Sequence, residues 1–126
     1  MLADNDGVAF LATAVPDESV SFYRDQLGLE LVEDSPFALV FACRNVMLRV
    51  QKVTAPTPVS HTVFGWDVAD IRETLRKLAQ RGIDAAFFPG LPQDETGIWA
   101  SPSGALVAWF RNPDGNCLSL TQFPEA

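Results

Sequence analysis

The stretch Asn112-Pro-Asp-Gly-Asn116, near the C-terminal end of the chain, decides the fold around it. Asn, Pro, Asp and Gly all favour tight turns, through their backbone preferences or their side-chain hydrogen bonds. Two β-prone runs flank this turn, over residues 106–111 and 117–123. We therefore predict a hairpin in which Trp109 pairs with Ser119. Because paired residues of an antiparallel ladder face the same way, both side chains point from one face of the sheet.

The first half of the chain contains one helical segment between β-prone runs. Apolar residues recur at helical spacing after Pro16, and Gly28 is placed to end that helix in a left-handed turn. The runs on either side are rich in β-branched and aromatic residues. We predict a strand, a helix and three further strands, over residues 8–15, 16–27, 29–33, 37–43 and 46–52.

The same order begins again at His61, after a segment over residues 53–60 whose prolines are typical of a linker. A clear amphipathic helix follows, with Ile71, Leu75 and Leu78 on one face, and Gly82 is placed to end it. We predict a strand, a helix and three further strands, over residues 61–66, 68–81, 83–88, 106–111 and 117–123.

The two halves form an internal repeat of the element order βαβββ. The first strand and the glycine that ends the helix are 20 positions apart in the first half, from Val8 to Gly28, and 21 in the second, from His61 to Gly82. We predict an α+β fold in a single domain over residues 1–126. Its parts are a module over about 8–52, a linker over 53–60 and a second module over about 61–123.

Composition excludes several classes of function. The 126 residues carry a net charge of −7, so nucleic acid and anionic membranes, which reward clustered Lys and Arg, are disfavoured as partners. One His and two Cys are too few for a Cys/His zinc cage, and we expect both thiols to be free in a reducing compartment. No signal peptide or membrane-spanning run is visible, so we expect a cytoplasmic protein.

Three features together resemble the vicinal oxygen chelate superfamily, which groups glyoxalases, bleomycin resistance proteins and extradiol dioxygenases. They are Val20-Ser-Phe-Tyr-Arg-Asp-Gln-Leu-Gly28, the repeated βαβββ order, and Asn112-Pro-Asp-Gly-Asn-Cys-Leu-Ser-Leu-Thr121. The resemblance implies two tandem modules whose curved mixed sheets form a cleft. It also implies that enzymatic members hold a divalent metal there, with one side chain from each of four strands.

The four metal positions of the superfamily map onto this chain with only one ligand retained. They fall on Val8, on or next to Leu48, on His61 and on Ser119. One imidazole and one hydroxyl do not hold a divalent ion. A shift of one residue at the second position would place Arg49 there, and an arginine is not a metal ligand. We therefore expect no metal and no other cofactor.

Strand alternation predicts what lines the cleft instead. It places Val8, Phe10 and Ala12 on the same face as Leu48, His61 and Ser119. Trp109 joins them through the hairpin pairing, while Trp99 lies in what reads as an inserted hairpin, with its orientation open between cleft, lid and interface. The predicted ligand-binding residues are Phe10, Leu48, His61, Trp99, Trp109 and Ser119. For the aromatic residues the competing interpretation is core packing, and for His61 it is a structural hydrogen bond.

Three hypotheses of function follow from these residues. The first is a metal-free homodimer that sequesters a planar or amphipathic small molecule in an aromatic cleft, similar to the bleomycin resistance proteins. The second is a metal-dependent lyase or dioxygenase of the same superfamily, similar to lactoylglutathione lyase. The third is an interaction or structural module whose cleft is filled by its own side chains. Because three of the four metal positions are not ligands, the first is preferred, and enzymatic activity is left open.

Overall fold

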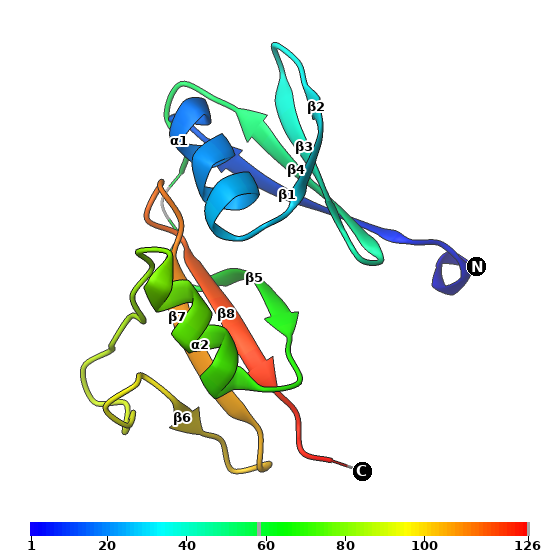
Figure 1. Cartoon of the computed structure of the whole chain (residues 1–126). Coiled ribbons are helices and arrows are strands. Elements are labelled where there is room, and N and C mark those ends of the chain that lie inside the picture. Colours follow the sequence, from blue (N-terminus) through cyan, green and yellow to red (C-terminus); the bar gives the residue numbers. More distant parts are fainter. Residues whose placement is uncertain (58, 126) are drawn as a thin grey trace. The chain divides into compact units, whose positions relative to one another are not determined.

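The chain contains two copies of the same arrangement, a helical segment and a four-stranded mixed sheet (Figure 1). The computed structural model describes residues 1–57 and 59–125. It divides into two compact units, Met1–Pro58 and Val59–Ala126, which are described separately below. The α+β class and the tandem βαβββ modules are confirmed. Among the described residues, no helix is long and apolar enough to cross a membrane.

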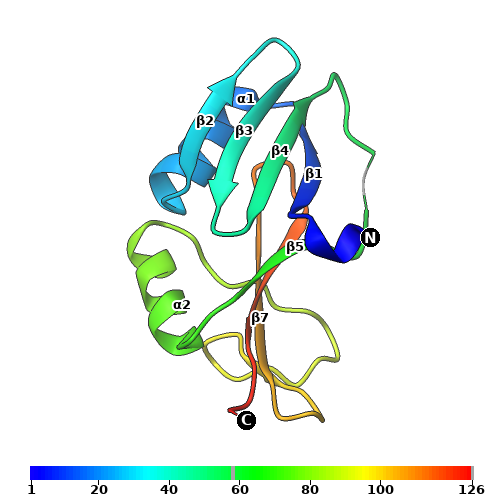
Figure 2. The same cartoon turned by 90° about the vertical axis from the view of Figure 1, so that its right-hand side faces the viewer.

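In the first unit the strand order is β1-β4-β3-β2, with β1 parallel to β4 and the other neighbours antiparallel (Figure 2). β2, β3 and β4 form an antiparallel meander, and its last strand, β4, pairs with the N-terminal strand β1. The elements of this unit are η1 (Leu2–Asp4), β1 (Gly7–Thr13), α1 (Pro16–Val20), η2 (Ser21–Gln26), β2 (Glu30–Asp34), β3 (Ala38–Cys43) and β4 (Val46–Lys52).

The helix of the first unit begins and ends as the sequence predicts. Pro16 occupies its first turn, where a missing N–H group costs nothing. The helix continues as the π-helical η2, and Gly28, with φ of 80°, follows in the left-handed region. A buried hydrogen bond of 2.8 Å between the hydroxyls of Thr13 and Ser19 ties β1 to α1. The helix therefore covers one face of this sheet.

Leu48 lies on the helix-covered face of the first unit, whereas Phe10 lies on the open face. In the ladder Leu48 aligns with Ala9 and Phe41, and Phe10 aligns with Arg49. Leu48 is fully buried, while 59% of Phe10 is exposed. The prediction that these two side chains share a face is therefore wrong. The parallel register of β1 and β4 differs by one residue from the one that strand alternation suggested.

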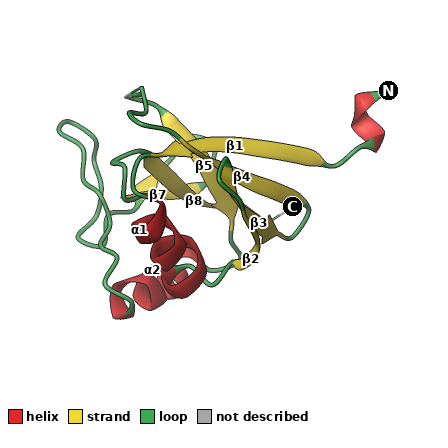
Figure 3. Cartoon of the chain, turned by 90° about the horizontal axis from the view of Figure 1, so that it is seen from above, coloured by secondary structure: helices red, strands yellow, loops and turns green. Residues whose placement is uncertain are grey.

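The second unit repeats this arrangement, with the strand order β5-β8-β7-β6 and β5 parallel to β8. Figure 3 shows α2 lying against this sheet. Its core combines the buried helix residues Ile71 and Leu78 with Phe110 of β7, whose ring stacks on that of Trp66. The elements are β5 (Thr62–Asp67), α2 (Ile71–Gln80), β6 (Trp99–Ala100), β7 (Leu106–Arg111) and β8 (Cys117–Gln122).

Asp70 and Gly82 set the ends of α2. The Asp70 carboxylate accepts a hydrogen bond of 3.1 Å from the backbone N–H of Glu73, so the helix begins three residues later than Val68, where the sequence placed its start. Gly82 has φ of 83°, and the N–H of Ile83 returns to the carbonyl of Leu78. The predicted end of the helix is confirmed.

The strand predicted over residues 83–88 is wrong, because the fourth place in the second sheet belongs to the two-residue strand β6. The segment runs beside β7 but donates only one backbone hydrogen bond to it, from Ala86 to the carbonyl of Trp109 at 2.7 Å. The carbonyl of Ala86 and the N–H of Phe88 bond to the side chain of Gln93 instead. The side-chain amide of Gln93 thus forms hydrogen bonds with backbone groups that would otherwise pair in a β-ladder.

Candidate ligand-binding site

The second unit's sheet has an open face, opposite α2, onto which Trp109 and Ser119 project. The β7–β8 hairpin pairs Trp109 with Ser119, Phe110 with Leu118 and Arg111 with Cys117, which confirms the predicted register. Phe110 and Leu118 are buried on the helix side, so the alternate residues Trp109 and Ser119 lie on the other side. Both are half-buried.

The indole of Trp109 lies across the open face of the sheet. Its Nε1 donates a hydrogen bond of 3.1 Å to Oγ1 of Thr62 on β5, although β8 separates the two strands. Thr62 aligns with Cys117 in the parallel ladder, so this contact independently places Trp109 on the same face as Cys117. The hydrogen bond fixes the direction of the indole ring on this face.

Trp99 and Phe88 flank Trp109. The ring centroids of Trp99 and Trp109 are 6.3 Å apart, and those of Phe88 and Trp109 are 5.5 Å apart in an edge-to-face arrangement. Trp99 of β6 pairs with Val107 of β7, and Val107 is two residues from Trp109 in the same strand. Trp99 and Trp109 therefore lie on the same side of the second unit's sheet. We call Phe88, Trp99 and Trp109 the aromatic face.

Gln93 holds the aromatic face together, and sequence reasoning missed it. Its Oε1 accepts from the N–H of Phe88 at 2.8 Å, and its Nε2 donates to the carbonyls of Ala86 and Gly97 at 3.0 and 2.9 Å. It also forms an isolated bridge with Trp99. One amide therefore joins the chain before Phe88 to the chain before Trp99. A lone Gln in a Pro/Gly-rich loop carries no pattern that announces such a role.

Asp94 anchors the same loop to α2. Its Oδ1 accepts from the hydroxyl of Thr96 at 2.6 Å and from the N–H groups of Thr96 and Ile98, both at 2.9 Å, and Oδ2 accepts from Arg72 at 3.3 Å. The hydrogen bond from the Thr96 hydroxyl, followed by that from Ile98, lowers the pKa of Asp94 from an ordinary 3.8 to about 2. Asp94 therefore joins the loop to the helix by its side-chain hydrogen bonds.

Gly65 makes room for the hydroxyl of Ser119. These residues are neighbours in the parallel β5–β8 ladder, and a Cβ atom built on Gly65 would lie 2.2 Å from Oγ of Ser119. No side chain can stand at Gly65 while that hydroxyl keeps its position. The open face therefore combines aromatic rings with two hydroxyls, those of Ser119 and Thr62.

His61 lies just outside the strand that the sequence assigned to it. β5 begins at Thr62, and it is Thr62, not His61, that aligns with Cys117. The imidazole of His61 is exposed and has no hydrogen-bond partner among residues 1–57 and 59–125. The structure thus brings Trp99, Trp109 and Ser119 to one face and places His61 at the beginning of that sheet. Phe10 belongs to the open face of the first unit, and Leu48 to its core.

The four positions that correspond to metal ligands in the enzymes do not fit a divalent ion. Val8 has an apolar side chain, Leu48 is buried on the helix-covered face, Ser119 offers a neutral hydroxyl, and only His61 is a strong donor. Across the described part of the chain, no three His, Cys, Asp or Glu side chains gather closely enough to hold a metal. The two cysteines are free thiols, Cys43 half-buried and Cys117 buried.

Comparisons with known proteins agree with this fold. Residues 7–120 match the sequence model of the Glyoxalase/Bleomycin resistance protein/Dioxygenase superfamily. A bleomycin resistance determinant encoded on the transposon Tn5 superposes with a TM-score of 0.73 at 19% identity, covering 94% of this chain and 97% of its own. No curated protein matches the chain significantly.

Two further solved structures have the same fold. A glyoxalase/bleomycin resistance protein/dioxygenase from Nocardioides superposes with a TM-score of 0.73 at 21% identity, covering 97% of this chain and 85% of its own. The oxidase ChaP-H2 superposes with a TM-score of 0.70 at 20% identity, covering 97% of this chain and 95% of its own. At these identities the likeness concerns the fold, and the activity has to be argued from this chain's own residues.

Proposed function

Because the chain belongs to the Glyoxalase/Bleomycin resistance protein/Dioxygenase superfamily, we propose that it binds a planar or amphipathic small molecule on the aromatic face, without a metal. The observation that carries this proposal is the fixed indole of Trp109, held by Thr62 and flanked by Trp99 and Phe88. Each of the three rings is only half-buried, so each keeps surface for a ligand.

A planar ligand suits this surface for physical reasons. Stacked or edge-to-face aromatic contacts contribute about 0.5–1.5 kcal/mol each beyond the burial of area. A ring held in one orientation loses little entropy when a ligand stacks on it. Trp109 is held by its hydrogen bond, and the loop that carries Phe88 is held by Gln93. The aromatic face is therefore organised before any ligand arrives.

Polar groups beside the three rings would orient the ligand through hydrogen bonds. The hydroxyl of Ser119 lies two strands from Trp99 on the same face, and the exposed imidazole of His61 stands at the beginning of β5. We propose that both serve as hydrogen-bond partners of the ligand. The proposal for the aromatic face includes neither Phe10, which is exposed on the open face of the first unit, nor Leu48, which is fully buried.

Fluorescence of the full chain tests the proposal, because two of the three Trp residues belong to the aromatic face. Planar aromatic compounds are titrated into chelator-treated protein while Trp emission is recorded, and the NMR signal of the Trp109 indole N–H is followed in parallel. We expect saturable quenching and a shift of that signal. Trp66→Phe, on the helix-covered side, is the control that keeps the response. Absence of saturation with every compound, or shifts confined to residues away from the aromatic face, would contradict the proposal.

A homodimer and a cytoplasmic location complete the proposal. β1 and β5 lie at the edges of their sheets, and unpaired edges favour association. The open face of the first unit also exposes apolar side chains, including Phe10 and Met47, of the kind that mark interfaces. Sedimentation equilibrium at micromolar concentration is expected to give twice the mass of the chain, and a monomer would contradict the dimer.

A further inference from the structure

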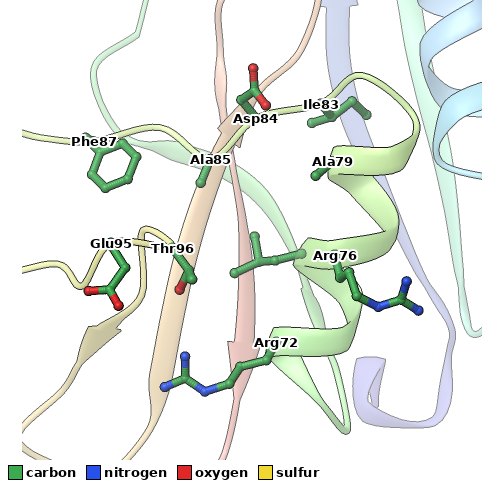
Figure 4. Close-up of a pocket in the computed structure, with 10 residues that line it drawn as sticks. Arg72, Arg76, Ala79, Ile83, Asp84, Ala85, Phe87, Glu95 and Thr96 are labelled. Atoms are coloured by element: carbon green, nitrogen blue, oxygen red, sulfur yellow. The ribbon is translucent and has the colours of Figure 1, made fainter.

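A hollow of about 540 Å³ lies in the second unit, beside α2. Figure 4 shows it walled by α2 and by the segments that carry Ala85, Phe87 and Thr96. Side chains alternate along extended chain, so Phe87 lines this hollow while Phe88 packs on Trp109. We call it the α2 groove. Its lining residues are Arg72, Leu75, Arg76, Ala79, Ile83, Asp84, Ala85, Phe87, Glu95 and Thr96.

The floor of the α2 groove is apolar. Leu75 and Ala79 come from one side of the helix, and Ile83, Ala85 and Phe87 from the segment that follows it. Phe87 is 58% exposed, so its ring offers apolar surface at the edge of this floor. The volume lies within the range of pockets that hold small organic ligands.

The charged side chains at the rim of the α2 groove differ in whether they have an ion-pair partner. Arg76 donates two hydrogen bonds to Glu73, at 2.9 and 2.5 Å, and this pairing raises the pKa of the Arg76 guanidinium and lowers that of the Glu73 carboxyl. Arg72 donates to Asp94. The carboxylates of Asp84 and Glu95 have no ion-pair partner among residues 1–57 and 59–125. The uncompensated charge around the apolar floor is therefore negative.

We propose that the α2 groove is a second binding site, which takes a small protonated amine with an apolar or aromatic body. The body would replace water over Leu75, Ala85 and Phe87, and the ammonium group would lie at the rim beside Glu95, on the side of Phe87, whereas the Asp84 carboxylate points away from this part of the groove (Figure 4). An ammonium ion beside the Phe87 ring gains a further cation–π attraction. The net charge of −7 favours the approach of a cation over that of an anion.

Three probes that share a three-carbon chain on a phenyl ring test the class of ligand. 3-Phenylpropylamine, 3-phenylpropionate and 3-phenyl-1-propanol differ chiefly in charge, and each is titrated at pH 7 and low salt while backbone amide shifts are recorded. We expect saturable shifts at Leu75, Ala79 and Ala85 with the amine, and at least fivefold weaker binding of the other two. Equal binding of all three overturns the proposed class, and absence of saturation by the amine at millimolar concentration overturns the site.

Charge-neutral variants locate the ammonium group. Glu95→Gln and Asp84→Asn both preserve shape; Glu95→Gln is expected to weaken amine binding about threefold or more, and Asp84→Asn to weaken it less, because the Asp84 carboxylate points away from the groove. Asp17→Asn on α1 changes the net charge equally and is expected to leave amine binding unchanged. Ala79→Phe, at an exposed helix position, is expected to fill the groove and abolish binding while the far-UV circular dichroism is retained. Binding that survives all of these variants, or shifts centred on the Trp109 indole, would overturn the site independently of the proposal for the aromatic face.

Discussion

The indole Nε1 of Trp109 donates a hydrogen bond to Oγ1 of Thr62, 3.1 Å away, across the strand that lies between them. This contact holds the side chain of Trp109, in the middle of β7, against the first strand of the same sheet. It also explains why Thr62, and not the neighbouring His61, is the β5 residue most closely tied to the candidate site.

Thr62→Val tests this contact while preserving the shape of the side chain. The indole N–H loses its acceptor, and because this region is open to solvent we expect a cost at the lower end of about 0.5–1.5 kcal/mol in the free energy of unfolding. The indole N–H resonance of Trp109 should move, and its ring should become more mobile by NMR relaxation. Thr62→Ser is the matched control that retains the hydroxyl. An unchanged indole resonance in Thr62→Val would show that the bond does not exist in solution.

Much of the fold follows from local patterns, because turn and helix-end signals act over a few residues. The turn over residues 112–116 fixes the β7–β8 register, so the pairing of Trp109 with Ser119 could be predicted. Pairing between β1 and β4 involves strands distant in sequence, and no local turn sets its register. This is why the facing of Leu48 was predicted wrongly.

The aromatic face could be predicted only in part. Trp109 followed from the hairpin, but Phe88 and Trp99 reach it through a loop whose path depends on the hydrogen bonds of Gln93. Composition shows that residues 89–97 are rich in turn-forming types, without indicating which side chain organises them. Long-range side-chain bonds of this kind leave no periodic trace in a sequence.

Gln93→Leu should loosen the loop that carries Phe88. The substitution removes three hydrogen bonds to backbone groups, and unsatisfied part-buried groups cost about 1–3 kcal/mol each when water does not replace the partner. Hydrogen exchange at the amide of Phe88 is the direct measurement, and we expect it to accelerate at least tenfold. Gln80→Leu, at an exposed helix end, is the control that leaves it unchanged. Equal exchange rates in Gln93→Leu and the native protein would contradict the role assigned to Gln93.

Asp94 should make stability depend on acid pH. Its pKa is lowered in the folded chain from 3.8 to about 2, so the carboxylate stabilises the fold fully above pH 3.8, and this contribution is lost as the pH falls toward 2. Urea unfolding at pH 6 and at pH 2.5 should therefore show a smaller difference for Asp94→Asn than for the native chain. Asp17→Asn, which removes an exposed carboxylate, is the control, and its difference between the two pH values should equal that of the native chain. The same difference in Asp94→Asn and the native protein would refute this prediction.

Gly65→Ala should displace the hydroxyl of Ser119. The added methyl group would lie 2.2 Å from Oγ and 3.0 Å from the backbone carbonyl oxygen of Ser119. We expect a loss of about 1–3 kcal/mol in the free energy of unfolding, as for other overpacked sites. In a Ser119→Ala background the loss should be smaller, because the closest atom is gone. Equal losses in both backgrounds would mean that the two side-chain positions do not compete.

The central claim is that the aromatic face binds a planar ligand and needs no metal to do so. Calorimetric titration tests it most directly, because heat reports binding even when a Trp residue is replaced. With a planar compound that quenches Trp emission, we predict the same dissociation constant for chelator-treated protein with and without added Mn²⁺, Ni²⁺, Zn²⁺ or Fe²⁺. For Trp109→Leu we predict an affinity loss of about tenfold, the equivalent of one stacking contact. Binding that appears only with a stoichiometric metal ion, or that is unchanged in Trp109→Leu, would contradict the account.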